Sequence, residues 1–124
     1  MSVSVLVVED SKNMQSALVD LFNTLGGFNV LATVATETEA TEWLYRNRGG
    51  WQLVTLDLLL DEGSGFNLIQ RCKLEPGAGQ VVVLSDFVTP VVRDRCLELG
   101  ADAVFHKSES REFADYLLTL RAQQ

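Results

Sequence analysis

The chain has 124 residues and a mass of 13.7 kDa, which is the size of one domain built around one hydrophobic core. Its 47% hydrophobic and 22% charged residues exclude intrinsic disorder, and its net charge of −7 argues against direct binding to nucleic acid, whose phosphates would repel it. Because no apolar run reaches the roughly 18 residues of a membrane span and the first residues lack the basic start of a signal peptide, we expect a cytoplasmic protein without membrane insertion.

From residue 3 to residue 107, short β-branched runs alternate with amphipathic stretches of helical period, and glycine or proline lies near most junctions. In chain order we expect a strand at Val3–Val8, a helix from Ser11 to Leu25, a strand at Asn29–Ala35, a helix from Thr36 to Gly49, a strand at Leu53–Leu58, a helix from Ser64 to Glu75, a strand at Gln80–Leu84, a helix from Pro90 to Gly100, a strand at Ala103–His106 and a helix after Ser110. The first, third and fourth strands are almost continuously apolar, which is typical of central strands covered on both faces.

Five strand and helix units in alternation predict an α/β fold, because parallel strands need crossover helices on the faces of their sheet. The predicted architecture is a flavodoxin-like, doubly wound (βα)5 three-layer sandwich with the parallel strand order 2-1-3-4-5. We expect a single domain over residues 1–124, with no output domain. Ligands of such sheets bind beyond the carboxyl ends of the strands, so the residues at those ends are the candidates for a site.

Charged and polar residues occupy the carboxyl ends of four predicted strands. Glu9 and Asp10 follow the first strand, Asp57 lies at the end of the third, Ser85 follows the fourth and Lys107 follows the fifth. Three carboxylates beside one ammonium repel each other unless a cation joins them, and Mg²⁺ suits a few carboxylates plus a phosphate ligand. Asp57 could then attack phosphorus as a nucleophile to form an aspartyl phosphate, with Lys107 and Ser85 contacting the phosphoryl oxygens.

Each of these residues also has a structural interpretation when it is considered alone. Glu9 and Asp10 fit a solvated helix start, where carboxylates favour the positive end of the helix dipole. Asp57 could cap a helix or close a turn, Ser85 could end a strand and Lys107 could be a surface charge. Only their joint placement at one edge of the sheet indicates a site.

Four segments carry a resemblance that covers essentially the whole chain: VLVVEDSKNMQSAL, LVTLDLLLDEGSGFNLI, VVVLSDF and GADAVFHKS. In this order and at this spacing they resemble the receiver domain of two-component response regulators. The resemblance implies the following site residues: Asp57 as phosphoacceptor and Mg²⁺ ligand, Glu9, Asp10 and the backbone carbonyl of Leu59 as further Mg²⁺ ligands, and Ser85 and Lys107 as the hydroxyl and the lysine of the family.

By the same resemblance the chain is a signalling protein rather than an enzyme, and it catalyses only its own phosphotransfer and dephosphorylation. The donor would be a phosphohistidine of a sensor histidine kinase or of a histidine phosphotransfer protein, and the output a contact with a downstream protein target. Two alternatives stay open: a degenerate receiver that only binds protein, and a flavodoxin-like cofactor-binding protein. The second is disfavoured because the turn at residues 9–13 is acidic and has no glycine to cradle a phosphate.

Two positions depart from the family pattern. Val104 lies three residues before Lys107, where the family usually has an aromatic switch residue, and Phe105 should face the opposite side of the sheet. Ser108 follows the lysine where the family usually has a proline in a cis bond, so we expect strain or a rebuilt loop there. His106, beside them, is interpreted as structural.

Leu59 and Phe87 each lie two residues beyond a site residue, Asp57 and Ser85 respectively. Both are apolar and bulky, so we expect them to shield an acyl phosphate from in-line attack by water, which predicts slow self-dephosphorylation. The change of state on phosphorylation is expected in the Asp86–Pro90 loop and in the start of the helix that follows it.

Overall fold

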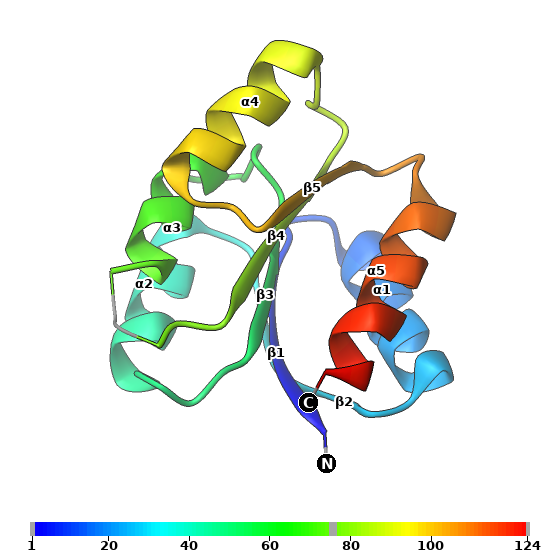
Figure 1. Ribbon diagram of the computed structural model, residues 1–124. Coiled ribbons are helices and arrows are strands. Elements are labelled where there is room, and N and C mark those ends of the chain that lie inside the picture. Colours follow the sequence, from blue (N-terminus) through cyan, green and yellow to red (C-terminus); the bar gives the residue numbers. More distant parts are fainter. Residues whose placement is uncertain (1, 75–76, 124) are drawn as a thin grey trace.

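The computed structural model describes residues 2–74 and 77–123, which form five strands and five helices in strict alternation (Figure 1). The elements are β1 (Val3–Val8), α1 (Lys12–Leu25), β2 (Phe28–Val34), α2 (Glu37–Arg46), β3 (Leu53–Leu56), α3 (Gly65–Cys72), β4 (Gln80–Ser85), α4 (Pro90–Leu99), β5 (Ala103–His106) and α5 (Ser110–Ala122). Every predicted element is present, and the boundaries differ by a few residues.

The strands form one parallel sheet in the order β2-β1-β3-β4-β5. Helices α1 and α5 cover one face of this sheet, and α2, α3 and α4 cover the other (Figure 1). The order reverses at β1, where the chain first adds β2 on one side and then β3 on the other. The prediction of a doubly wound three-layer sandwich is therefore confirmed, and the carboxyl ends of the central strands meet at one edge.

The boundaries differ at the end of α2, which lies at Arg46 rather than Gly49, and on both sides of the loop before α3. Strand β3 ends at Leu56 rather than Leu58, because the Asp57 carboxylate accepts the N–H of Leu59 at 3.2 Å and turns the chain out of the sheet. Helix α3 ends at Cys72, and the predicted end at Glu75 lies outside the described residues. The apolar residues that follow Asp57 made the predicted strand longer than the segment that pairs in the sheet.

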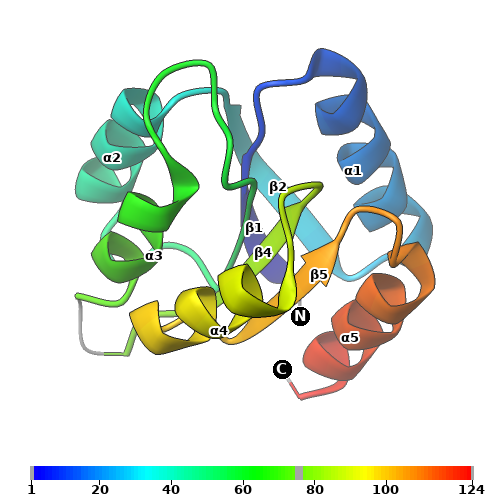
Figure 2. The same ribbon diagram turned by 90° about the horizontal axis from the view of Figure 1, so that it is seen from above.

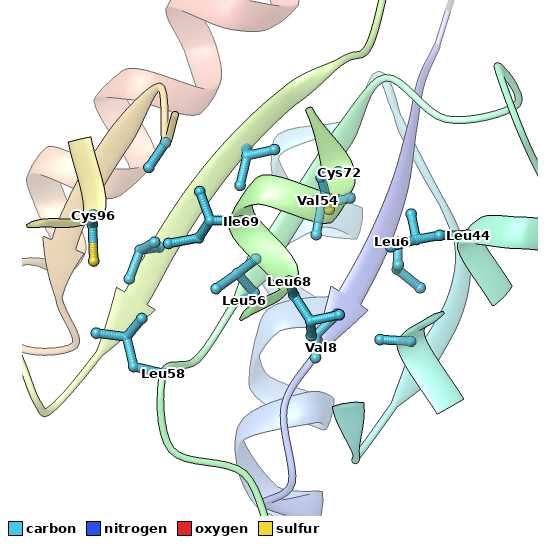
Figure 3. Packing of buried hydrophobic residues seen from close by; sticks show 14 of the residues in the cluster. Leu6, Val8, Leu44, Val54, Leu56, Leu58, Leu68, Ile69, Cys72 and Cys96 are labelled. Atoms are coloured by element: carbon cyan, nitrogen blue, oxygen red, sulfur yellow. The ribbon is translucent and has the colours of Figure 1, made fainter. Parts of the chain in front are cut away.

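The larger core cluster fills the space between the sheet and helices α2, α3 and α4. Leu56 of β3 packs there with Leu68 and Ile69 of α3, and all three are at most 1% exposed (Figure 3). The free thiols Cys72 and Cys96 lie in the same cluster and are buried. Burial raises the pKa of Cys72 to about 12, so this thiol behaves as a small apolar side chain.

The second cluster lies between the sheet and helices α1 and α5, where Phe22 and Phe113 are its largest buried members. Because side chains alternate along a strand, Thr55 points toward this side, between Leu53 and Asp57. Thr55 is 1% exposed, and its hydroxyl has no hydrogen-bond partner among the described residues. Such a group lowers stability because it loses its hydrogen bonds to water without replacing them.

Serine or threonine hydroxyls cap the N-termini of four of the five helices. Ser11, Thr36, Ser64 and Thr89 each accept a backbone N–H from the first turn of α1, α2, α3 and α4 respectively. These caps satisfy donors that a helix leaves unpaired and hold the loops that precede them. Within residues 2–74 and 77–123, no helix has both the length and the apolar character needed to cross a bilayer.

Candidate functional site

Five of the six predicted site residues bring their side chains together at the carboxyl edge of the sheet: Glu9, Asp10, Asp57, Ser85 and Lys107. Figure 2 shows this edge from above. Lys107 Nζ lies 2.8 Å from Asp57 Oδ2 and 2.8 Å from Glu9 Oε1. Ser85 Oγ donates a hydrogen bond of 2.5 Å to Asp57 Oδ1. Asp10 completes a group of three carboxylates with Glu9 and Asp57. The predicted convergence of these residues is therefore present in the structure.

Burial and mutual hydrogen bonds shift the pKa values of Glu9 and Lys107. Burial raises the pKa of the Glu9 carboxyl, and hydrogen bonds from Lys107 and from the Ser11 backbone oppose that shift only in part. For Lys107 itself, burial disfavours the ammonium, but hydrogen bonds to Asp57 and Glu9 outweigh this and raise its pKa above 10.5. The lysine therefore keeps its positive charge at neutral pH, at the point where Asp57 and Glu9 meet.

The carboxylates have the spacing that one hard cation requires. One oxygen from each of Glu9, Asp10 and Asp57 lies within 4.8 Å of the other two. Lys107 can balance only one of three negative charges, so the group keeps a surplus that a divalent cation would offset. Oxygen donors and excess negative charge fit Mg²⁺, while ligation by the backbone carbonyl of Leu59 stays a prediction.

Two residues outside the predicted set, Gln15 and Asp61, also belong to this edge. Gln15 of α1 is buried and donates through its side-chain amide at 2.5 Å to the backbone carbonyl of Glu9. Asp61 lies close enough to Asp10 that the hydrogen bond and the charge of Asp10 raise the pKa of the Asp61 carboxyl. A polar residue within the apolar stripe of α1 was the signal for Gln15.

Strand β5 shows how the chain is built without an aromatic residue three places before the lysine. Val104 is 3% exposed and packs in the cluster on the α4 side, whereas Phe105 packs on the other side against Phe113 and Tyr116, with ring centroids 5.7 Å apart in both pairs. The expectation that Phe105 faces the opposite side is confirmed. On the α4 side, Arg93 donates to the backbone carbonyl of Val104.

The turn after Lys107 contains no cis bond, since all peptide bonds among the described residues are trans. Instead, Ser108 Oγ lies 2.8 Å from His106 Nδ1, and the N–H of Ser108 donates to the same nitrogen at 3.0 Å. The N–H of Glu109 donates to the carbonyl of His106 at 2.8 Å. Of the two expected outcomes, the rebuilt loop is therefore the one observed, and His106 holds it together.

The two apolar residues expected to shield the site lie in its flanking loops. Leu59 follows Asp57 and is 58% exposed, and Phe87 follows Ser85 and is 44% exposed. The N–H of Phe87 donates to Ser85 Oγ at 3.1 Å, so the position of this loop depends on the hydroxyl that also contacts Asp57. Both side chains are exposed rather than packed in the core, and shielding of the site by them stays a prediction.

Several solved structures share the fold. A two-component response regulator of the LuxR family from Aurantimonas sp. SI85-9A1 has 21% identity and a TM-score of 0.85, over 100% of this chain and 88% of that one. The response regulator domain of Thermotoga maritima CheB has 21% identity and a TM-score of 0.82, over 99% and 96%. A chain of the CheX–CheY–BeF3–Mg²⁺ complex from Borrelia burgdorferi has 25% identity and a TM-score of 0.79, over 85% of this chain and 78% of that one.

The family is established by the sequence itself. The pattern of the response regulator receiver domain matches residues 5–116, which include all of the site residues described above. No protein of curated function is similar enough to the sequence to add a more specific assignment. The chain therefore belongs to the response regulator receiver domain family, whose members are phosphorylation-dependent signalling modules.

Proposed function

We propose that Asp57 accepts a phosphoryl group from a phosphohistidine of a sensor histidine kinase or a histidine phosphotransfer protein, in a Mg²⁺-dependent reaction in the cytoplasm. The observation that carries the proposal is the Lys107 ammonium, which lies 2.8 Å from both Asp57 Oδ2 and Glu9 Oε1. In that place it can offset the charge of an incoming phosphoryl group. The buried free thiols Cys72 and Cys96 are compatible with a reducing compartment.

In the transfer, a carboxylate oxygen of Asp57 attacks phosphorus. A new P–O bond forms while the P–N bond to the donor histidine breaks, and the electron pair of that bond stays on the imidazole nitrogen. The structure holds the Asp57 carboxylate with three donors: the Ser85 hydroxyl and the Leu59 N–H on Oδ1, and Lys107 on Oδ2. A carboxylate fixed in this way loses little orientational freedom before the reaction.

The residues that would hold Mg²⁺ are Glu9, Asp10 and Asp57 together with the backbone carbonyl of Leu59. When bound, the ion supplies positive charge next to the phosphoryl oxygens. Gln15 supports this role of Glu9, since its amide fixes the backbone of Glu9 at the end of β1.

Output follows from the change in charge at Asp57. Ser85 Oγ now donates to Asp57 Oδ1 and accepts the N–H of Phe87 at 3.1 Å, so a hydroxyl that turns toward a phosphoryl oxygen must change its contact with the loop after β4. This favours a shift in the Asp86–Pro90 loop and in the start of α4, and a downstream protein that binds this surface would read the shift.

The test is the intact mass of the protein after incubation with Mg²⁺ and acetyl phosphate. Wild type should gain one phosphoryl group, Asp57→Asn should gain none, and chelation of Mg²⁺ should abolish the gain. Asp86→Asn is the matched control, because it removes an exposed carboxylate one residue from Ser85 without touching the cluster. If Asp57→Asn were labelled as fast as wild type, the assignment would be wrong, and an unlabelled wild type would favour a degenerate receiver that only binds protein.

A further inference from the structure

Hydrogen bonds to two carboxylates connect the loop between β3 and α3 with the first turn of α2. One carboxylate belongs to the helix and accepts from the loop, and the other belongs to the loop and accepts from the helix. Glu37 of α2 accepts the N–H of Ser64 at 2.8 Å and the side-chain amide of Asn67 at 3.2 Å. Glu62 of the loop accepts the N–H of Thr38 at 3.1 Å, and its carbonyl accepts the N–H of Glu37 at 3.0 Å. Each segment thus supplies an acceptor to the helix start of the other.

Glu37 also packs directly on the loop. Gly63 has a φ of +83°, and a Cβ at this position would lie 2.3 Å from the Cβ of Glu37. The β3–α3 loop and the first turn of α2 therefore approach each other more closely there than a side chain at position 63 would allow.

A short path leads from Glu37 to the site. Ser64, whose N–H Glu37 accepts, pairs with Leu59 as an isolated antiparallel bridge. Leu59 in turn donates its N–H to Asp57 Oδ1 at 3.2 Å. Glu37 is thus two contacts away from the residue whose carbonyl is the proposed Mg²⁺ ligand, and three from the phosphoacceptor.

Capping of α2 does not require Glu37. Thr36 already accepts the N–H of Glu39 at 3.1 Å, and Glu39 Oε1 accepts the N–H of Ala35 at 3.1 Å. These contacts cap the helix within its own segment, whereas the carboxylate of Glu37 bonds only to the loop and α3 in the contacts described above.

We infer that Glu37 is a positioning residue for Mg²⁺ binding: by holding Ser64, it fixes the Leu59 backbone so that its carbonyl is in place before the ion arrives. This inference rests on the proposed function and adds a residue outside the carboxylate cluster to it. A residue that orients a metal ligand raises the metal affinity, because a loop that is already ordered loses less conformational entropy when the ion binds.

The experiment measures Mg²⁺ affinity by titration calorimetry and hydrogen exchange of the Ser64 amide in the metal-free protein. Glu37→Ala should weaken Mg²⁺ binding about tenfold and speed exchange at Ser64. Glu37→Gln keeps an acceptor oxygen and should stay close to wild type in both measurements. Glu39→Ala is the matched control, since it removes a carboxylate from the same helix turn, and it should leave Mg²⁺ affinity unchanged.

Glu62→Ala tests the inference through a separate residue, because it removes the side-chain acceptor of the Thr38 N–H and leaves only the backbone bond from Glu37 to the carbonyl of residue 62, and it should also weaken Mg²⁺ binding. Wild-type affinity in Glu37→Ala would overturn the inference while the proposed function stood. An equal loss in Glu37→Ala and Glu37→Gln would also overturn it, because the loss would then follow charge rather than position. A wild type that bound no Mg²⁺ would overturn the proposed function and the inference together.

Discussion

Gly65, the first residue of α3, lies against the backbone of Asp57, the proposed phosphoacceptor. Its N–H donates to the carbonyl of Leu58 at 3.0 Å, and a Cβ built on it would lie 2.0 Å from the carbonyl oxygen of Asp57. Since Cβ atoms essentially never approach closer than 3.0 Å, Gly65→Ala requires the two backbones to separate by about 1 Å. A displacement of that size at the reacting group costs about a hundredfold in rate.

Helix propensity alone predicts the opposite effect on stability. Alanine is favoured over glycine in a helix by about 0.5–1 kcal/mol, whereas overpacking against a rigid backbone costs about 1–3 kcal/mol. We therefore expect Gly65→Ala to lower the free energy of unfolding and to slow phosphorylation of Asp57 by about a hundredfold. The assays are urea denaturation and the rate of phosphoryl gain with acetyl phosphate at saturating Mg²⁺.

Gly79 supplies the matched control at the opposite edge of the sheet. A Cβ on Gly79 would lie 2.5 Å from the carbonyl oxygen of Gln52, so Gly79→Ala meets the same kind of clash far from the site. It should lower stability and leave the rate of phosphorylation of folded protein unchanged. If Gly65→Ala were phosphorylated at the wild-type rate, or if Gly79→Ala were slowed as much as Gly65→Ala, close packing of Gly65 on Asp57 would not control the reaction.

Thr55, the Leu59 and Phe87 pair, and Glu109 each allow a separate test. Thr55→Val should raise the free energy of unfolding by about 1 kcal/mol, because it removes a buried hydroxyl without a partner among the described residues. Urea denaturation measures this, and a loss of stability would contradict it. Leu59→Asn with Phe87→Glu should shorten the lifetime of the phosphorylated protein after the donor is removed, because it replaces the two bulky apolar side chains that we expect to keep water from the acyl phosphate; an unchanged decay would rule shielding out. The hydrogen bond from the His106 N–H holds the pKa of the Glu109 carboxyl below 4.5, and the hydrogen bond and charge of Arg93 add a smaller effect in the same direction. Its contribution to stability is thus present above pH 4.5 and lost as the pH falls through the lowered pKa, so Glu109→Gln should lose less thermal stability than wild type over that range.

The site could be predicted from the sequence because its residues follow apolar strands. Val3–Val8 and Leu53–Leu56 are buried runs, and a charged residue directly after such a run must lie at the edge of the sheet. The parallel topology then brings Glu9, Asp57 and Lys107 together although they are up to 98 positions apart in the chain, as residues 9 and 107 show. Strand ends and topology were therefore sufficient for the cluster.

The contacts around the cluster could not be predicted in the same way. The bond from Ser64 to Glu37 joins residues 27 positions apart, and it depends on how the α2 start and the β3–α3 loop approach each other. The end of β3 at Leu56 depends on one side-chain contact of Asp57, which leaves no trace in the hydrophobic pattern. Hydrophobic period reports which face is buried, whereas these features depend on individual hydrogen bonds.

The phosphorylated residue can be identified by a chemical reaction of the acyl phosphate itself. Protein phosphorylated with acetyl phosphate and Mg²⁺ is reduced with borohydride, which converts an aspartyl phosphate to homoserine, and is then digested and sequenced by mass spectrometry. We expect homoserine at position 57 and aspartate at positions 10, 61 and 86. Homoserine at any of these other positions, with aspartate retained at 57, would show that Asp57 is not the phosphoacceptor.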